Sequence, residues 1–275
     1  MTTYLDSAQV LRRSIDSILA QTFPNFEFIV VFEPDDSNYD LVVREYGDLR
    51  LAAARCDVRT GMAGSFNVGL SLARGRYIAR MDSDDYAYPE RLERQLRHLA
   101  THPELALVGA AGRLVDGSDN EVGFRRFPTT HEAIVRHFGF TNPIFHPTVM
   151  WDRAQVGYDL RYDLAPEVQE DTELWLRLIR SGHRFANMPD ILIDYQQPEG
   201  YRRPGREWSK GARTRVRHWQ LGLKQPLFLV GTTARVLLAA LPAKLIHRLT
   251  ERNRLSDRFR SIDCAAPRRK GKADC

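Results

Sequence analysis

Apolar residues follow two different periods along the first part of the chain. Residues 7–21 place three aliphatic side chains at helical spacing, with a proline just beyond, which predicts an amphipathic helix. Residues 26–32 (FEFIVVF) form a β-branched and aromatic run that ends in the turn-forming sequence Glu-Pro-Asp-Asp. That run predicts a buried strand leading into a loop.

The alternation of strands and helices then continues. Helices are predicted over 63–74, closed by Gly75, and over 89–101, where a proline stands in the first turn. Strands are predicted over 77–81 and 105–111. Strands that alternate with helices predict an α/β fold with a doubly wound, mostly parallel sheet and helices on both faces.

The middle of the chain is less regular. Residues 145–151 (FHPTVMW) and 191–195 are expected to be strands. Residues 170–181 have the pattern of an amphipathic helix that turns Leu174 and Leu178 inward.

Composition narrows the class of protein. The chain has 275 residues, of which 43% are hydrophobic and 27% charged, so it is a globular protein and neither a disordered chain nor a coiled coil. Three widely spaced cysteines exclude a disulfide framework and a zinc-cysteine site, and they favour a reducing compartment.

The net charge of +5 is unevenly distributed. Residues 201–275 contain 19 Lys and Arg against 5 Asp and Glu, whereas residues 1–200 contain 21 arginines, no lysine and 30 acidic residues. An acidic body with a basic tail predicts attachment to a polyanion or to an anionic membrane surface. Nucleic acid is not expected as a partner, because no base-reading motif accompanies the tail.

The most apolar stretch of the tail, residues 226–249, is interrupted by Arg235 and is too short on either side to span a bilayer. We therefore expect residues 201–260 to form basic amphipathic helices that lie on the membrane. A packed helical hairpin and a spanning segment are the alternatives. Residues 261–275 are expected to be disordered.

Two acidic clusters, at 33–36 and 82–85, follow predicted strands. Ligands of doubly wound sheets bind beyond the carboxyl ends of the strands. In an extended segment Asp82 and Asp84 present their carboxylates to the same side, and oxygen ligands of this kind suit Mg²⁺ or Mn²⁺. The alternative is that Asp-Ser-Asp-Asp is an ordinary turn.

These residues resemble a known family. Residues 61–85 (GMAGSFNVGLSLARGRYIARMDSDD) are similar to the donor-binding core of the family 2 glycosyltransferases, which have the GT-A fold. Residues 15–28 (IDSILAQTFPNFEF), 145–150 (FHPTVM) and 170–178 (EDTELWLRL) are similar to other stretches of that family. The resemblance extends over residues 1–197.

The resemblance implies roles for the residues of the DxD sequence. Asp84 would bind the divalent cation, Mn²⁺ or Mg²⁺, that bridges the donor diphosphate. Asp82 would support the ribose or the metal, and Asp85 would support the turn.

Other residues would belong to the donor site. Glu33 stands where the family has an Asp that contacts the nucleobase, and Arg59 and Asn67 lie in the matching donor region. Thr3 and Tyr4 resemble the end of the family's first strand, which helps to hold the base. The strand itself is missing from this sequence, so we expect a slot in the sheet. We also expect either a natural start upstream of Met1 or an impaired protein.

For the acceptor side, the resemblance makes Asp171 the catalytic base, next to Glu170 in the Glu-Asp motif. A positioned carboxylate can accept the proton of a sugar hydroxyl as that hydroxyl attacks. Helix capping is the alternative for these two acids. Trp175 would stack on a sugar or pack in the core, and His146 would hold acceptor or phosphate or be an ordinary buried histidine.

The resemblance thus implies a metal-dependent, inverting glycosyltransferase with a UDP- or dTDP-linked sugar donor and a saccharide or lipid-linked acceptor. Its catalytic domain would be residues 1–200, with donor binding in 1–112 and acceptor binding in 113–200. We expect it at the cytoplasmic face of the cell membrane, in cell-envelope polysaccharide or glycolipid synthesis. A sugar-phosphate nucleotidyltransferase and a catalytically degenerate sugar-nucleotide-binding protein are the alternatives.

Overall fold

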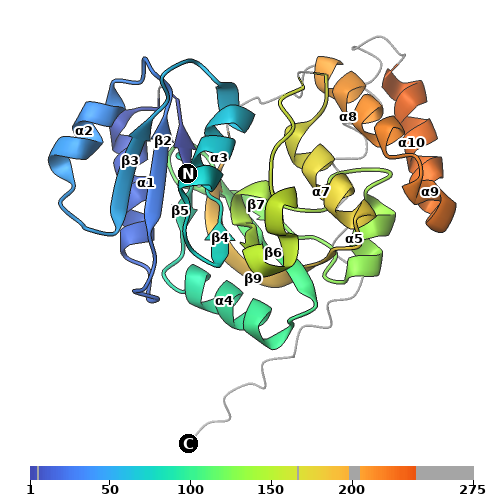
Figure 1. The fold of residues 1–275 in the computed structure, drawn as a ribbon, viewed down its shortest axis with the longest axis horizontal. Helices are drawn as coiled ribbons and strands as arrows, with labels where there is room; N and C mark the ends of the chain where they lie inside the picture. Colours follow the sequence, from blue (N-terminus) through green and yellow to red (C-terminus); the bar gives the residue numbers. More distant parts are fainter. Residues whose placement is uncertain (5, 166, 198–204, 240–275) are drawn as a thin grey trace, which may run out of the picture. The chain divides into compact units, whose positions relative to one another are not determined.

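Three short parallel strands form the first sheet of the computed structural model (Figure 1). They are, in spatial order, β1 (Thr2–Thr3), β2 (Phe28–Phe32) and β3 (Leu51–Arg55). The structure describes residues 1–239 except residues 5, 166 and 198–204. The apolar run predicted as a strand is β2, and its side chains pack against Leu11 and Ile15 on the predicted first helix.

The helices carry most of the predicted periodic segments. The first four α-helices are α1 (Ala8–Leu19), α2 (Asn38–Glu45), α3 (Gly61–Leu72) and α4 (Arg91–Thr101). The next three are α5 (His131–His137), α6 (Arg153–Val156) and α7 (Glu170–Arg180). The last three are α8 (Gly205–Arg217), α9 (Leu221–Lys224) and α10 (Pro226–Ala239). Two single 3₁₀ turns cover His146–Thr148 and Gly157–Asp159.

The second sheet has six strands, and most of its pairs are antiparallel. The strands are β4 (Tyr77–Ala79), β5 (Tyr86–Ala87), β6 (Leu105–Val115), β7 (Glu121–Arg125), β8 (Met150–Asp152) and β9 (Arg184–Gln196). Their order is β4-β8-β6-β9-β5, with β7 paired to β6.

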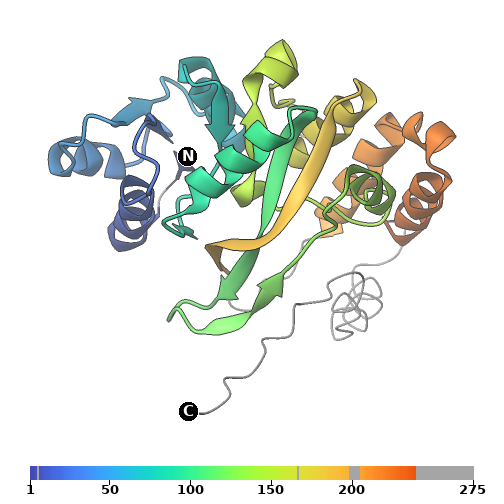
Figure 2. The same ribbon diagram turned by 90° about the horizontal axis from the view of Figure 1, so that it is seen from below.

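The prediction of a mostly parallel sheet is therefore wrong for this second sheet. Only the long pair β6–β9, which Figure 2 shows side by side, is parallel. The turn after β6 closes a hairpin with β7, and a short hairpin can only join antiparallel strands. Sequence periodicity reports which residues are buried but not the direction of the neighbouring strand.

The segment predicted as a strand over 145–151 also differs. It begins with the 3₁₀ turn at His146–Thr148, and only Met150–Asp152 pairs in the sheet. Pro147 has no backbone N–H to donate and fixes its own φ angle, which favours a turn. The Thr148 hydroxyl, at 2.9 Å, accepts a hydrogen bond from the backbone N–H of Ala110 in β6.

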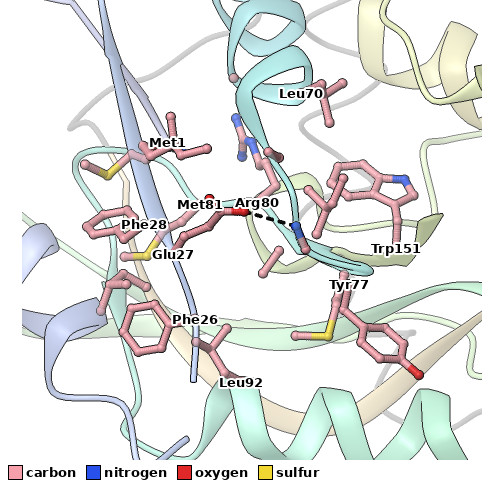
Figure 3. A pocket seen from close by; sticks show the side chains of 18 of the residues that line it. Met1, Phe26, Glu27, Phe28, Leu70, Tyr77, Arg80, Met81, Leu92 and Trp151 are labelled. Carbon is pink, nitrogen blue, oxygen red and sulfur yellow. Dashed lines mark hydrogen bonds between the residues drawn. The ribbon is translucent and has the colours of Figure 1, made fainter. Parts of the chain in front are cut away.

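The two sheets meet at β1. Thr2 pairs with Val31 of β2 on one side and bridges to Asp82, just after β4, on the other. Beyond this short strand β2 and β4 are separated by a cavity of about 710 Å³. Figure 3 shows Met1 and Phe28 on one side of the cavity and Trp151 on the other. The slot expected in the sheet is therefore present.

The main core lies between the second sheet and α7. Leu174, Trp175 and Leu178 on this helix are fully buried, as predicted for the inward-facing leucines. The indole rings of Trp151 and Trp175 lie 5.8 Å apart, and Phe185 of β9 packs edge-on against Trp175. This packing fixes the start of α7, where the two acids of the Glu-Asp sequence stand.

Helices α8 and α10 pack on this core. The Thr214 hydroxyl of α8 accepts a hydrogen bond of 2.9 Å from the backbone N–H of Gln169, the residue before α7. Among the described residues, no helix combines the length and the apolar character that crossing a membrane requires. The expectations for residues 240–260 and 261–275 lie outside the described residues.

Candidate active site

The acidic residues after β4 form a compact cluster. One carboxylate oxygen from each of Asp82, Asp84 and Asp85 lies within 4.8 Å of the others. The segment is a turn and not the extended stretch that the sequence suggested, since Asp82 bridges to β1 and the next two residues bend. In an extended strand only Asp82 and Asp84 would face the same side. Because the segment turns, the Asp85 carboxylate lies beside them as well.

Electrostatics within the cluster are unfavourable without a cation. Burial, together with the charges of Asp82 and Asp6, raises the pKa of Asp84 to about 6. Burial and the charges of Asp82 and Asp84 raise the pKa of Asp85 well above its usual value. One Asp85 oxygen accepts a hydrogen bond from the backbone N–H of Gln196, and the other is buried with no hydrogen-bond donor among the described residues. Buried carboxylates with an oxygen to spare fit a divalent cation.

A buried arginine that sequence reasoning missed stands beside the cluster. The guanidinium of Arg80 forms an ion pair with Asp82, and it lies 4.8 Å from the centre of the Phe66 ring. Arg80 is only 5% exposed, so the pair lies in a poorly screened environment. Its signal in the sequence was a charged residue in an otherwise apolar strand, two positions before Asp82.

Tyr4 and Arg59, both predicted for the donor site, lie together in an exposed group. Arg59 donates a hydrogen bond of 2.6 Å to the Tyr4 hydroxyl, stacks over the Tyr4 ring at 4.8 Å and forms an ion pair with Asp35. Asp35 belongs to the first acidic cluster and was not singled out from the sequence. This group presents an aromatic face and a cation to solvent.

Thr3 connects this edge of the sheet to the acidic turn. Its hydroxyl donates a hydrogen bond of 2.8 Å to Asp6, and the same Asp6 oxygen accepts a hydrogen bond of 2.6 Å from Ser83. Thr3 is buried, so its side chain acts within the protein.

Glu33 and Asn67 make internal contacts. The Glu33 carboxylate is 4% exposed and accepts hydrogen bonds from Ser65 and from the hydroxyl and N–H of Thr60. The Asn67 amide makes two hydrogen bonds, of 2.9 and 2.8 Å, to the backbone of Tyr162. The contacts of Glu33 hold the start of α3, and those of Asn67 hold the loop before α7.

Asp171 lies half-buried at the start of α7, next to Glu170. One of its oxygens accepts a hydrogen bond of 2.7 Å from the side-chain amide of Asn142, and the other accepts from Thr172. Burial and the charges of Asp171 and Asp82 raise the pKa of Tyr162 against the opposing charge of Arg80. The candidate base and the acidic cluster are therefore both within electrostatic reach of this tyrosine.

Trp175 and His146 both belong to the packed interior. Trp175 is fully buried, which is what the core alternative predicts. His146 packs against Phe66 and Trp175, and its Nε2 lies 2.6 Å from the Tyr162 hydroxyl. Burial and Arg80 lower the pKa of His146 well below its usual value.

The two sheets, the carboxylate cluster at their junction and the acid at the start of α7 define an α/β protein of the GT-A type. Residues 1–155 match the family described as "Glycosyl transferase family 2". This match covers more than half of the chain, so the protein belongs to that family and is a glycosyltransferase.

Several curated proteins are similar to it along most of their length. The amylovoran biosynthesis glycosyltransferase AmsE of Erwinia amylovora is 28% identical over 252 residues, which cover 89% of this chain and 93% of that protein. The putative glycosyltransferase EpsE of Bacillus subtilis is 33% identical over 200 residues, or 69% of each chain. The O-antigen biosynthesis glycosyltransferase WbnJ of Escherichia coli is 30% identical over 193 residues, or 66% of this chain and 72% of that protein.

Two solved structures show the same fold. S. aureus TarS 1–349 in complex with UDP-GlcNAc has a TM-score of 0.66 at 18% identity and covers 88% of this chain and 75% of its own. The mannosyltransferase PcManGT from Pyrobaculum calidifontis, in complex with GDP-Man and Mn²⁺, has a TM-score of 0.60 at 18% identity, over 94% and 80%. At these identities the likeness shows the fold alone.

Proposed function

We propose that the protein transfers a sugar from a nucleoside diphosphate donor to a hydroxyl of a saccharide or lipid-linked acceptor, with inversion at the anomeric carbon. The observation that carries the proposal is the carboxylate cluster at the junction of the two sheets in a family 2 glycosyltransferase. The family match also favours glycosyl transfer over the nucleotidyltransferase alternative.

Asp84 and Asp82 would hold a divalent cation, Mn²⁺ or Mg²⁺, with Asp85 supporting the turn. The spare buried oxygen of Asp85 and the raised pKa of Asp84 support this, because both show that the ion pair of Arg80 with Asp82 leaves negative charge of the cluster uncompensated. When bound, the cation offsets the negative charge that develops on the departing diphosphate. A neighbouring structure of the same fold, PcManGT, is in complex with GDP-Man and Mn²⁺.

Asp171 would act as the base. Its carboxylate accepts hydrogen bonds from Asn142 and Thr172, which fix its orientation. An ionised, oriented carboxylate can take the proton of the attacking acceptor hydroxyl. A single attack opposite the leaving group inverts the anomeric carbon.

The donor would lie along the edge formed by Tyr4 and Arg59, where the nucleobase can stack on an aromatic face beside a cation. The buried Thr3 would hold this edge in place through its hydrogen bond to Asp6. The contacts of Glu33 and Asn67 support a role in holding this region and not direct binding of the base. We take a UDP- or dTDP-linked sugar as the donor. TarS, whose fold is similar, was solved in complex with UDP-GlcNAc.

The biological setting would be cell-envelope polysaccharide synthesis. The names of three similar proteins, AmsE, WbnJ and the succinoglycan biosynthesis protein ExoO of Rhizobium meliloti, support this. We infer peripheral attachment to the inner face of the cell membrane through the basic residues after 200. Residues 201–275 contain 19 Lys and Arg against 5 Asp and Glu.

The test is release of nucleoside diphosphate from a panel of sugar nucleotides, with and without saccharide acceptors, in Mn²⁺ and in EDTA. We expect EDTA and Asp84→Asn to remove turnover, and Asp171→Asn to lower transfer about a hundredfold or more while donor binding persists. The exposed Asp159 supplies the control, since Asp159→Asn should act like the wild type. Undiminished transfer in Asp171→Asn would contradict the assignment of the base.

A further inference from the structure

Helix α10 exposes most of its aliphatic residues and buries its one charged residue, which is the opposite of a typical surface helix of a soluble protein. The only charged residue among its fourteen is Arg235, and this residue is buried, together with Phe228, Gly231 and Thr232. Its inner side holds a glycine, a threonine and an arginine, whereas a surface helix normally buries its aliphatic residues.

The outer side of α10 is mainly apolar, and its one exposed polar residue among the described residues is Thr233. Leu237 is 66% exposed, Val230 57% and Leu227 49%, and two further aliphatic residues of this side are exposed as well. Just before the helix, Leu223 on α9 is 70% exposed and Trp219 is 50% exposed. We call these residues the apolar face; its members are Trp219, Leu223, Leu227, Leu229, Val230, Val236 and Leu237.

The inward side of α10 is fixed by specific contacts, so the helix cannot simply turn over. Gly231 lies directly against Gly139 after α5, close enough that a Cβ atom at Gly231 would lie 2.4 Å from the Gly139 carbonyl carbon. The Arg235 guanidinium donates a hydrogen bond of 2.7 Å to the Phe140 carbonyl and lies 4.8 Å from the Trp208 ring. The exposure of the apolar face is thus a property of the packed structure.

Charge around the apolar face identifies its partner. Residues 208–239 contain six Lys and Arg and no Asp or Glu. Of these, Arg213 and Lys224 are exposed on α8 and α9, whereas the exposed Arg217 already forms an ion pair with Asp163. A patch of aliphatic residues with a half-exposed tryptophan and a surround of cations matches the boundary between lipid headgroups and acyl chains.

We propose that the apolar face of α9 and α10 docks into the surface of an anionic lipid bilayer, with the helices lying flat on it. The aliphatic residues enter the acyl boundary, and the exposed cations pair with lipid phosphates. The membrane attachment inferred above for the basic residues after 200 would then take place through this apolar face. The proposal needs no catalytic activity, so it can fail or hold independently of the proposed reaction.

The experiment is flotation of the full chain with vesicles of phosphatidylcholine, with and without phosphatidylglycerol. The test variant combines Leu223→Ser, Val230→Ser and Leu237→Ser, and the control combines Val43→Ser, Leu49→Ser and Val58→Ser, which are exposed aliphatic residues elsewhere. We expect wild type and control to float with anionic vesicles and the test variant to bind about tenfold less.

The fluorescence of Trp219 supplies a second readout, which is measured on the wild-type chain. We expect its fluorescence to be quenched by brominated acyl chains, and Trp219→Phe to remove that quenching. The proposal is overturned if the test variant floats like the wild type, or if neutral vesicles bind equally well. It is also overturned if the test variant converts a dimer to a monomer while vesicle binding is absent, because the occupant would then be a second copy.

Discussion

At the scale of single residues, the negative charge of Asp84 lowers the free energy of unfolding of the metal-free protein. Its pKa is about 6 in the folded state against 3.8 as an unperturbed residue, so between these values the folded protein binds more protons than the unfolded chain. Stability therefore rises as the pH falls through about 6, and the full penalty applies above it. A group that destabilises the fold in this way is characteristic of a binding site.

We predict that Asp84→Asn raises the free energy of unfolding of the metal-free protein by about 2 kcal/mol near pH 7.5, and that the gain vanishes near pH 4. Urea denaturation at both pH values measures this. Mn²⁺ should stabilise the wild type but not the variant. Glu104→Gln, at an exposed acid, is the control. A loss of stability in Asp84→Asn at neutral pH would contradict the account.

The hydrogen bond from Asn142 to Asp171 allows a test of the base. Asn142→Asp would place a second carboxylate at hydrogen-bond distance from the first, so the pair would share a proton and lose this second proton only at higher pH. We predict that the acidic limb of the pH–rate profile for transfer moves up by about one unit or more.

Asn120 offers a matched control for this substitution, because its side-chain amide also donates to an aspartate, Asp116, in the turn between β6 and β7. Asn120→Asp should leave the profile unchanged. A profile that is the same in Asn142→Asp as in the wild type would mean that Asp171 does not set the acidic limb.

At the scale of elements, the contact between α10 and the end of α5 supports the loop that carries Asn142. Gly231→Ala would put a Cβ atom into the Gly139 backbone, and no side-chain rotation can relieve such a contact. We predict a loss of about 1–3 kcal/mol of unfolding free energy, despite the better helix propensity of alanine. Gly47→Ala, which points into open space, should cost far less, and equal losses in urea denaturation would contradict this packing.

Elements with strong periodicity were predictable from sequence, and those decided by tertiary contacts were not. The helix at α7 followed from its 3.6-residue apolar period. Strand β3 (LAAAR) was missed, because alanine has little strand propensity and only pairing with β2 holds it extended. The expected strand at 145–151 was mostly a turn because of Pro147.

The same division holds for the site. The acids after β4 and at the start of α7 were found because a motif carries them. Asn142, Arg80 and Asp35 were not found, because each is part of the site only through a contact that the fold creates. Asn142, for example, donates a hydrogen bond to Asp171. No local pattern records such a pairing.

At the scale of the whole molecule, the acidic cluster stands where the two sheets are joined. Thr2 connects β2 to Asp82, so the position of the cluster depends on both sheets. The cavity between β2 and β4 begins on the other side of this junction, and among its lining residues none belongs to the cluster. The reaction that we propose thus belongs to the junction of the sheets at β1 and not to the cavity between β2 and β4.

The central claim is that Asp84 and Asp82 hold a divalent cation against the donor diphosphate. The most direct measurement is anomalous diffraction from a crystal soaked with UDP and Mn²⁺. The account predicts a manganese peak at bonding distance from the Asp84 carboxylate, with the diphosphate on its other side. A nucleotide bound elsewhere, or a manganese peak away from Asp82, Asp84 and Asp85, would contradict it.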